Sequence, residues 1–246
     1  MSDLKIFSKD IIVKDKRVIL RLDLNVPIKN SNIDDYTRIE VVENFINELI
    51  KNKAKIILIS HLGRPKGRVI SSLSMKPIFH YFEKKLNGKI YFYKERIDTK
   101  AIDASNKLKP GEVLLIENIR FFSEEENDDE IFAKNLAKLG DIYINEAFSC
   151  SHRKQASLHN ITKFIDSYGG PNLEKELKSI NLITKNKKKP VTCIIGGSKV
   201  STKINILSSL IRSSDNLVIV GAMANNFIKF KGINVGASLV ERCKKY

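Results

Sequence analysis

The chain has 246 residues, a formal net charge of +15, 42% hydrophobic residues and 29% charged residues. This length suits one large domain or two modest ones, and the composition is that of a globular protein rather than a disordered or fibrous one. The longest apolar run, residues 217–224, is far shorter than the ~20 residues that cross a bilayer, and no signal-like segment opens the chain. We therefore expect neither export nor membrane insertion, and the three scattered cysteines indicate a cytoplasmic protein without disulfides or structural zinc.

The positive charge comes mostly from lysine, which is typical of a solvated surface. Nucleic-acid binding would rest on net charge alone, because no motif of interleaved basic and aromatic residues accompanies it. The few arginines are distributed differently, since most precede residue 154 and several fall in loops that follow predicted strands. A guanidinium group forms paired hydrogen bonds with carboxylates and phosphates. The sequence therefore favours a small anionic ligand over a nucleic-acid or membrane partner.

Short apolar runs alternate with helical patterns along the chain. Such runs predict strands that are covered on both faces, as in a parallel sheet. We predict strands at residues 17–24, 55–59, 89–93, 113–116, 141–144, 191–195 and 217–220. The alternation predicts an α/β fold in which a parallel, Rossmann-like sheet is built with right-handed crossovers.

Apolar residues spaced three and four apart predict helices between these strands. One helix is predicted to begin at Thr37, because Thr37 and Glu40 have the pattern of a capping box. Another is predicted near residues 131–139, after the acidic run at 124–130. This run could hold a metal ion, but acidic residues at a helix N-terminus are favoured by the helix dipole, and we prefer that simpler interpretation.

A change of pattern between about residues 166 and 190 predicts a domain boundary. We predict an α/β domain over residues 1–168, a connecting helix and linker over 169–189, and the beginning of an incomplete second α/β domain over 190–246. The last segment supplies only two strand–helix units, which cannot cover both faces of a sheet. It should therefore either pack on the first sheet or belong to a larger domain.

Polar side chains follow several of the predicted strands. Ligands of open parallel sheets bind beyond the carboxyl ends of the strands, so these positions are candidate site residues. One arginine after a strand is usually an ordinary surface residue, whereas arginines in several such loops predict a site for a ligand with two or more negative charges. The candidates are Asp23, Asn25, Arg38, His61, Arg64, Arg120 and Arg153.

A second candidate site follows the predicted strand at residues 191–195. Paired glycines there lead into a predicted helix whose buried face runs from Val200 to Ile211, and Lys199 and Lys203 share its first turn. Two cations at the positive end of a helix are unfavourable unless an anion is bound. Gly197, and Gly221 in the next strand–helix turn, would allow close approach of a ligand.

The two common nucleotide motifs, GxxxxGK[ST] and GxGxxG after a strand, are absent from this sequence. From spacing alone, phosphate binding by the glycine–lysine turn and simple helix packing both stay open. An anion site in one domain and a phosphate site in another would suit phosphoryl transfer, which depends on positioning and charge neutralisation.

Several motifs together resemble the phosphoglycerate kinase family, and their order and spacing match over essentially the whole chain. They are RLDLNVP at 21–27, TRI at 37–39, SHLGRP at 60–65, LKPGEVLLIENIRF at 108–121, NEAF at 145–148, HR at 152–153 and GGSKV at 196–200. The resemblance implies a glycolytic, cytoplasmic and monomeric enzyme. Its reaction would be the reversible transfer of a phosphoryl group between 1,3-bisphosphoglycerate with ADP and 3-phosphoglycerate with ATP, assisted by Mg²⁺.

The resemblance also implies roles for individual residues. Asp23 and Asn25 would contact the hydroxyl and carboxylate region of the phosphoglycerate. The phosphate of the phosphoglycerate would be bound by His61, Arg64, Arg120 and Arg153. The catalytic residues, which act on the transferring phosphoryl group, would be Arg38 and Lys199. The nucleotide would be bound by Gly197, Lys199, Lys203 and Gly221.

The sequence also departs from the family pattern. Glu146 stands where the family usually has Asp, Gln155 where many members have His, and Thr202 where many have Asp. The family's nucleotide domain continues past the counterpart of Tyr246 and includes the aspartate that holds Mg²⁺, so no metal ligand is predicted in this chain. We expect a phosphoglycerate kinase chain that lacks most of its nucleotide domain; the alternative is a non-catalytic fragment that only binds 3-phosphoglycerate.

Overall fold

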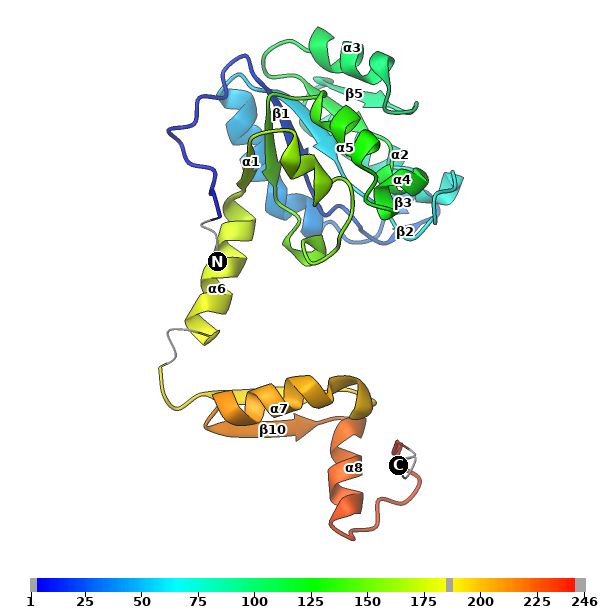
Figure 1. Ribbon diagram of the computed structural model, residues 1–246. Helices are drawn as coiled ribbons and strands as arrows, with labels where there is room; N and C mark the ends of the chain where they lie inside the picture. Colours follow the sequence, from blue (N-terminus) through cyan, green and yellow to red (C-terminus); the bar gives the residue numbers. More distant parts are fainter. Residues whose placement is uncertain (1–3, 185–187, 242–246) are drawn as a thin grey trace. The chain divides into compact units, whose positions relative to one another are not determined.

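The structure is a computed structural model that describes residues 4–184 and 188–241. It divides between Lys178 and Ser179 into two compact units, called here the N-terminal unit and the C-terminal unit (Figure 1). The division falls inside a helix, within the segment 169–189 for which the sequence predicts a connecting helix and linker. Linker residues 185–187 and the last five residues, which include Cys243, lie outside the described part. Cys150 and Cys193 are free thiols.

A six-stranded parallel sheet forms the centre of the N-terminal unit. Its spatial order is β5-β6-β4-β1-β7-β8, and every neighbouring pair is parallel. The chain passes from β1 to β4 on one side and later adds β7 on the other, so the strand order reverses at β1. The strands are β1 (Arg17–Arg21), β4 (Lys55–Ile59), β5 (Ile90–Tyr93), β6 (Val113–Ile116), β7 (Ile142–Asn145) and β8 (Ser167–Gly169).

The α/β class and the predicted strands are confirmed, with two differences in detail. β1 ends at Arg21 rather than at residue 24, although the Leu22 N–H still donates to the carbonyl oxygen of Ile59 at 2.9 Å. The edge strand β8 was not predicted, because Ser167–Gly169 is too short and too polar to stand out as an apolar run. A small antiparallel hairpin of β2 (Ile28–Lys29) and β3 (Asn32–Ile33) follows β1.

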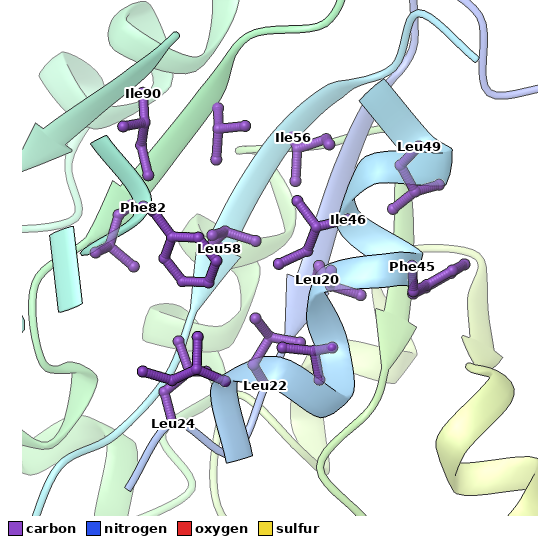
Figure 2. Close-up of a cluster of buried hydrophobic side chains, with 14 of the residues drawn as sticks. Leu20, Leu22, Leu24, Phe45, Ile46, Leu49, Ile56, Leu58, Phe82 and Ile90 are labelled. Atoms are coloured by element: carbon purple, nitrogen blue, oxygen red, sulfur yellow. The ribbon is translucent and has the colours of Figure 1, made fainter. Parts of the chain in front are cut away.

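Helices cover both faces of this sheet. Apolar side chains of α1 and α2 pack on one face and those of α3 and α5 on the other. Figure 2 shows the first of these layers, in which Phe45 and Ile46 of α1 lie against Leu20 and Leu58 of the sheet. The helices are α1 (Thr37–Lys51), α2 (Lys76–Lys85), α3 (Thr99–Lys107), α4 (Ser123–Glu126) and α5 (Glu130–Ala137), with short 3-10 helices at Ser71–Leu73, Ile119–Phe121, Phe148–Cys150 and Asn160–Lys163.

The predicted capping box at the start of α1 is wrong. Tyr36 is the N-cap, and no side chain caps the helix there. Thr37 is already helical, and its N–H and hydroxyl both donate to Asp35 Oδ1, at 2.9 and 2.6 Å. The acidic run also divides in two, because Asp129 caps α5 by accepting from the Phe132 N–H at 2.7 Å, while the residues before it form α4.

The C-terminal unit is a two-stranded parallel sheet with two helices. β9 (Thr192–Gly196) pairs with β10 (Asn216–Val220). A 3-10 turn at Ser201–Lys203 leads from β9 into α7 (Ile204–Ser213), and α8 (Ala222–Phe230) follows β10. The helix α6 (Pro171–Thr184) spans the division between the units. Among the described residues of this unit, Leu207 and Met223 are the buried apolar side chains.

The predicted buried face of the first helix in this unit is wrong. Ile204 is 53% exposed and Ile211 is 65% exposed, so Leu207 alone of the predicted face is buried. The reason is geometric: two strands present a surface too narrow to cover a whole helical stripe. No helix in the described residues combines the length and the apolar character needed to span a bilayer.

Candidate functional site

Three loops meet at the carboxyl edge of the large sheet, where β1, β4 and β7 end side by side. The Ser60 hydroxyl, just after β4, accepts from the Leu24 N–H and donates to the Leu22 carbonyl oxygen, each at 2.9 Å. From the loop after β7, the Ser149 hydroxyl donates to Asp23 Oδ2. The strand order reverses at this edge, which is the usual position for a ligand in an open α/β sheet.

Asp23 and Arg38 form an ion pair at this edge. Arg38 lies in the first turn of α1 and its Nη1 donates to Asp23 Oδ2. The Arg38 side chain is 49% exposed, whereas that of Asp23 is only 14% exposed. Asn25 connects the first two loops, because its Oδ1 accepts from the Gly63 N–H at 2.8 Å. The β1 loop and the β4 loop are therefore held in a fixed relation.

Arg120 is buried beneath the same loops. Its Nη1 donates to the Gly63 carbonyl oxygen at 2.9 Å, and its Nη2 donates to Gln155 Oε1 at 3.4 Å. Its buried Nε has no hydrogen-bond partner within the described residues, although Glu126 Oε1 lies 3.9 Å away. Burial lowers the pKa of Arg120, and the charges of Arg153 and Arg21 lower it further.

His61 lies at the centre of the arginines and carries no charge. It is 3% exposed, and its Nδ1 lies 3.4 Å from Arg21 Nη2. Burial lowers the pKa of His61 to about 2, with further lowering by the charges of four arginines, Arg21, Arg120, Arg153 and Arg38. Since all four guanidinium groups act on one imidazole ring, the arginines supply the positive charge of the edge and His61 does not.

The two remaining predicted arginines are accessible. Arg64 is exposed in the loop after β4, and Arg153 is partly exposed after the 3-10 turn at Phe148–Cys150. Within the described residues, neither guanidinium group donates a hydrogen bond, so both are available to an anion. The Arg153 N–H donates to the carbonyl oxygen of Cys150 at 2.9 Å, and the Cys150 Sγ lies 4.0 Å from His61 Nδ1. The charge of Arg153, like those of Arg38 and Arg120, lowers the pKa of His61. Within the described residues, no hydrogen bond or ion pair joins the Arg64 guanidinium to the other site residues.

An open pocket of about 250 Å³ adjoins this edge and is lined by Asp23, Arg38, Ser149 and Glu146 among others. Glu146 follows β7, is 6% exposed and accepts from the Asn172 N–H at 3.1 Å, at the start of α6. Burial raises the pKa of Glu146 to about 7. An added Cβ on Gly170 would lie only 1.8 Å from Glu146 Oε1, so a residue without a side chain is needed there.

Sequence reasoning missed a buried network of charges that supports the site. Arg21 is fully buried, and its Nε donates to the Ser157 hydroxyl at 2.9 Å, which in turn donates to Glu125 Oε1 at 2.6 Å. Burial raises the pKa of Glu125, and the Arg21 charge opposes that rise. Arg21 could have been noticed as a charge at the end of an apolar strand, whereas nothing distinguishes Glu125 within its acidic run.

Asp23, His61 and Cys150 each place one potential ligand atom within 4.8 Å of the others. This cluster does not suit a hard cation such as Mg²⁺. Hard cations such as Mg²⁺ prefer several oxygen ligands, and here the single carboxylate is already paired with Arg38. The surrounding guanidinium charges would also repel a cation.

In the C-terminal unit, the turns after β9 and β10 lie together. The Met223 N–H donates to the Gly197 carbonyl oxygen at 2.7 Å. Gly221 has φ 68° and ψ −163°, a conformation that is essentially restricted to glycine. The Lys203 side chain lies close to Gly197. If Gly197 carried a Cβ atom, that atom would be 3.2 Å from the Cε of Lys203. Two of the predicted nucleotide residues are thus adjacent to the Gly221 turn.

The predicted placement of the two lysines in one helical turn is wrong. Lys199 is exposed in the loop before the 3-10 turn, and Lys203 is the N-cap of α7. Lys203 is also the last residue of the 3-10 turn, so both lysines precede the α-helix instead of sharing its first turn. Both still border the loop that follows β9.

The fold and these loops define a parallel α/β protein with a candidate site for a small polyanion at the carboxyl edge of its sheet. The phosphoglycerate kinase family model matches residues 8–245, and the chain belongs to this family.

Similar proteins agree with this assignment. The chain is 49% identical over 230 residues to the phosphoglycerate kinase of Orientia tsutsugamushi, an alignment that covers 94% of this chain and 57% of that protein. It is 45% identical to the phosphoglycerate kinase of Rhizobium meliloti, covering 92% and 57% of the two chains. The phosphoglycerate kinase structure from Coxiella burnetii matches with a TM-score of 0.86 at 35% identity, covering 96% and 60%. The chain thus spans less than two thirds of the length of these relatives.

Proposed function

We propose that this chain supplies the phosphoglycerate site and part of the nucleotide-phosphate site of a phosphoglycerate kinase. The reaction would be reversible phosphoryl transfer between 1,3-bisphosphoglycerate with ADP and 3-phosphoglycerate with ATP, in cytoplasmic glycolysis. The observation that carries the proposal is the set of arginines, Arg38, Arg120 and Arg153, gathered around the uncharged His61. Membership of the family supports the choice of substrate.

The residues of the N-terminal unit suit a ligand that carries a phosphate and a carboxylate. Arg64 and Arg153 have no hydrogen-bond partners among the described residues, so they could bind a phosphate at little cost. Arg38 would stay near the reacting group, since it is half-exposed and paired with Asp23. Phosphoryl transfer depends mainly on neutralising charge and on positioning, and guanidinium groups provide both.

In the C-terminal unit, we assign nucleotide phosphates to the loop that bears Gly197, Lys199 and Lys203, with Gly221 beside it. The family generally acts on nucleotide bound to magnesium, and Mg²⁺ would neutralise phosphate charge in the reaction. No residue of this chain is proposed as its ligand. The predicted domains keep their roles in this proposal: residues 1–168 bind phosphoglycerate, 169–189 connect, and 190–246 contribute to nucleotide binding.

Calorimetric titration with 3-phosphoglycerate tests the first part of the proposal. We expect binding, and we expect Arg64→Ala to weaken it by about 1.5–3 kcal/mol, the value of a charged hydrogen bond. Arg68→Ala is the matched control, because Arg68 is an exposed arginine of the same loop and its loss changes the net charge equally. The absence of binding heat with the unaltered chain would reject the proposal.

A second candidate is a protein that binds 3-phosphoglycerate without turnover. A coupled ATP assay on the same preparation separates the two: sustained turnover rejects the binding-only alternative, whereas binding without turnover rejects independent catalysis.

A further inference from the structure

Glu241 lies 40 residues after Ser201 in the sequence, and its carboxylate binds the loop that carries Lys199. One oxygen, Oε2, accepts from the N–H groups of Val200 and Ser201, at 2.9 and 3.0 Å. The other, Oε1, accepts from the Ser201 hydroxyl. A single carboxylate therefore satisfies three donors of the turn between β9 and α7.

Glu241 is itself held in place by α8. Its N–H donates to Asn226 Oδ1 at 2.7 Å, and the Asn225 amide donates to the Leu239 carbonyl oxygen at 3.0 Å. Asn226 also donates to the Ala222 carbonyl oxygen at 3.3 Å, which fixes the orientation of its amide. The contact thus connects the turn after β9 to the helix that begins beside Gly221.

The turn has few other restraints. Val200 and Lys203, the N-cap residues of the 3-10 turn and of α7, make no capping hydrogen bond with their own side chains. The Thr202 hydroxyl donates to the Lys199 carbonyl oxygen at 3.3 Å. Within the turn, the backbone bond from the Lys203 N–H to the Val200 carbonyl oxygen, at 2.9 Å, joins its two ends. The hydrogen bonds from Ser201 and Val200 lower the pKa of Glu241, and the nearby Lys199 charge lowers it slightly further, so the carboxylate stays ionised at neutral pH.

We infer that Glu241 is a positioning residue that holds the turn between β9 and α7 so that Lys199 and Lys203 face a nucleotide phosphate. This inference rests on the proposed function. Glu241 donates nothing to a ligand; it acts by fixing the N–H groups of Val200 and Ser201 and hence the backbone on either side of Lys199. A competing role is that the carboxylate occupies the phosphate position itself and repels nucleotide. The two roles predict opposite changes in affinity.

The test compares ADP affinity and 3-phosphoglycerate affinity in the full chain with Glu241→Ala and Glu241→Gln. We expect Glu241→Ala to weaken ADP binding about tenfold, the order of one charged hydrogen bond, and to leave 3-phosphoglycerate binding unchanged. Glu241→Gln should weaken ADP binding less, because its amide oxygen still accepts from the backbone. Amide hydrogen exchange at Val200 and Ser201 should accelerate in the Ala variant and much less in the Gln variant.

Glu95→Ala is the matched control, since it removes one exposed negative charge from the N-terminal unit. Unchanged or tighter ADP binding by Glu241→Ala would overturn the inference while leaving the proposed function intact, and tighter binding would establish the competing role. If the unaltered chain bound 3-phosphoglycerate but not ADP, the nucleotide part of the proposed function would fail, and the inference with it. Unchanged exchange at Val200 and Ser201 would also overturn the inference.

Discussion

The N-terminal and C-terminal units repeat the same alternation of strand and helix, yet they bury it differently. β4 and β6 are buried along nearly their whole length, because each has a strand on both sides and helices on both faces. β9 and β10 alternate between exposed and half-buried residues, and Ile194 is 71% exposed. Apolar composition is similar in the two pairs of strands. The number of neighbours therefore decides burial.

The two candidate sites differ in the same way. The arginine site rests on side chains that are buried and mutually restrained, such as Arg21 and Arg120. The glycine–lysine turn rests on backbone conformation and on one carboxylate from a distant residue, Glu241. Removing one partner of a buried charge pair destabilises the fold. Removing a hydrogen-bond acceptor from an exposed turn should mainly change the conformation of that turn.

We expect the greatest loss of stability when a buried charge is removed. Arg21→Met would remove the buried guanidinium that is linked to the Glu125 carboxylate through the Ser157 hydroxyl. We expect the free energy of unfolding of the N-terminal unit to fall by about 3–5 kcal/mol. Arg96→Met is the control, since the exposed pair of Arg96 with Glu124 should be worth less than about 1 kcal/mol. Urea unfolding followed by circular dichroism measures both. Equal losses would contradict the difference drawn between buried and exposed charges; Arg21→Lys, which keeps the charge, provides a folded comparison.

Amide hydrogen exchange tests the difference in burial between the two sheets. Amides of β9 and β10 should exchange about a hundredfold faster than those of β1 and β4, because fewer neighbours protect them from local opening. Exchange followed by mass spectrometry or NMR on the unaltered chain gives the ratio directly. Equal protection in the two sheets would mean that the C-terminal unit buries its strands against another surface, such as a second chain.

The stability of the N-terminal unit should also depend on pH through Glu146. Its folded-state pKa of about 7 lies above the ordinary value of 4.5, so between these values the folded chain holds the extra proton. The stability that the folded chain gains from binding this proton is fully present below about pH 4.5. It is lost as the pH rises through about 7, and the total loss is up to about 3 kcal/mol.

Urea midpoints at pH 5 and pH 8 measure this change. Glu146→Gln should remove most of the difference between the two midpoints, since its amide does not titrate in this range. An undiminished difference in the Gln variant would assign the pH dependence to another group.

The α/β class, the positions of the long strands and the loops that carry the arginines can all be predicted from the amino-acid sequence alone. These features depend on local periodicity and on the polar residues that end each apolar run, which are visible without any partner. The same local signals failed for the edge strand β8, for the capping box of α1 and for the burial of Ile204 and Ile211, because those features depend on neighbouring parts of the fold.

Which charged side chains are buried and which are exposed becomes apparent only in the folded structure. His61 is uncharged because three loops bury it among guanidinium groups, and Glu125 differs from its acidic neighbours because Ser157 and Arg21 meet it from distant parts of the chain. Glu241 reaches the Lys199 turn in the same way. The charge state of a side chain depends on the groups that surround it in space, and the order of residues along the chain does not show which groups those are.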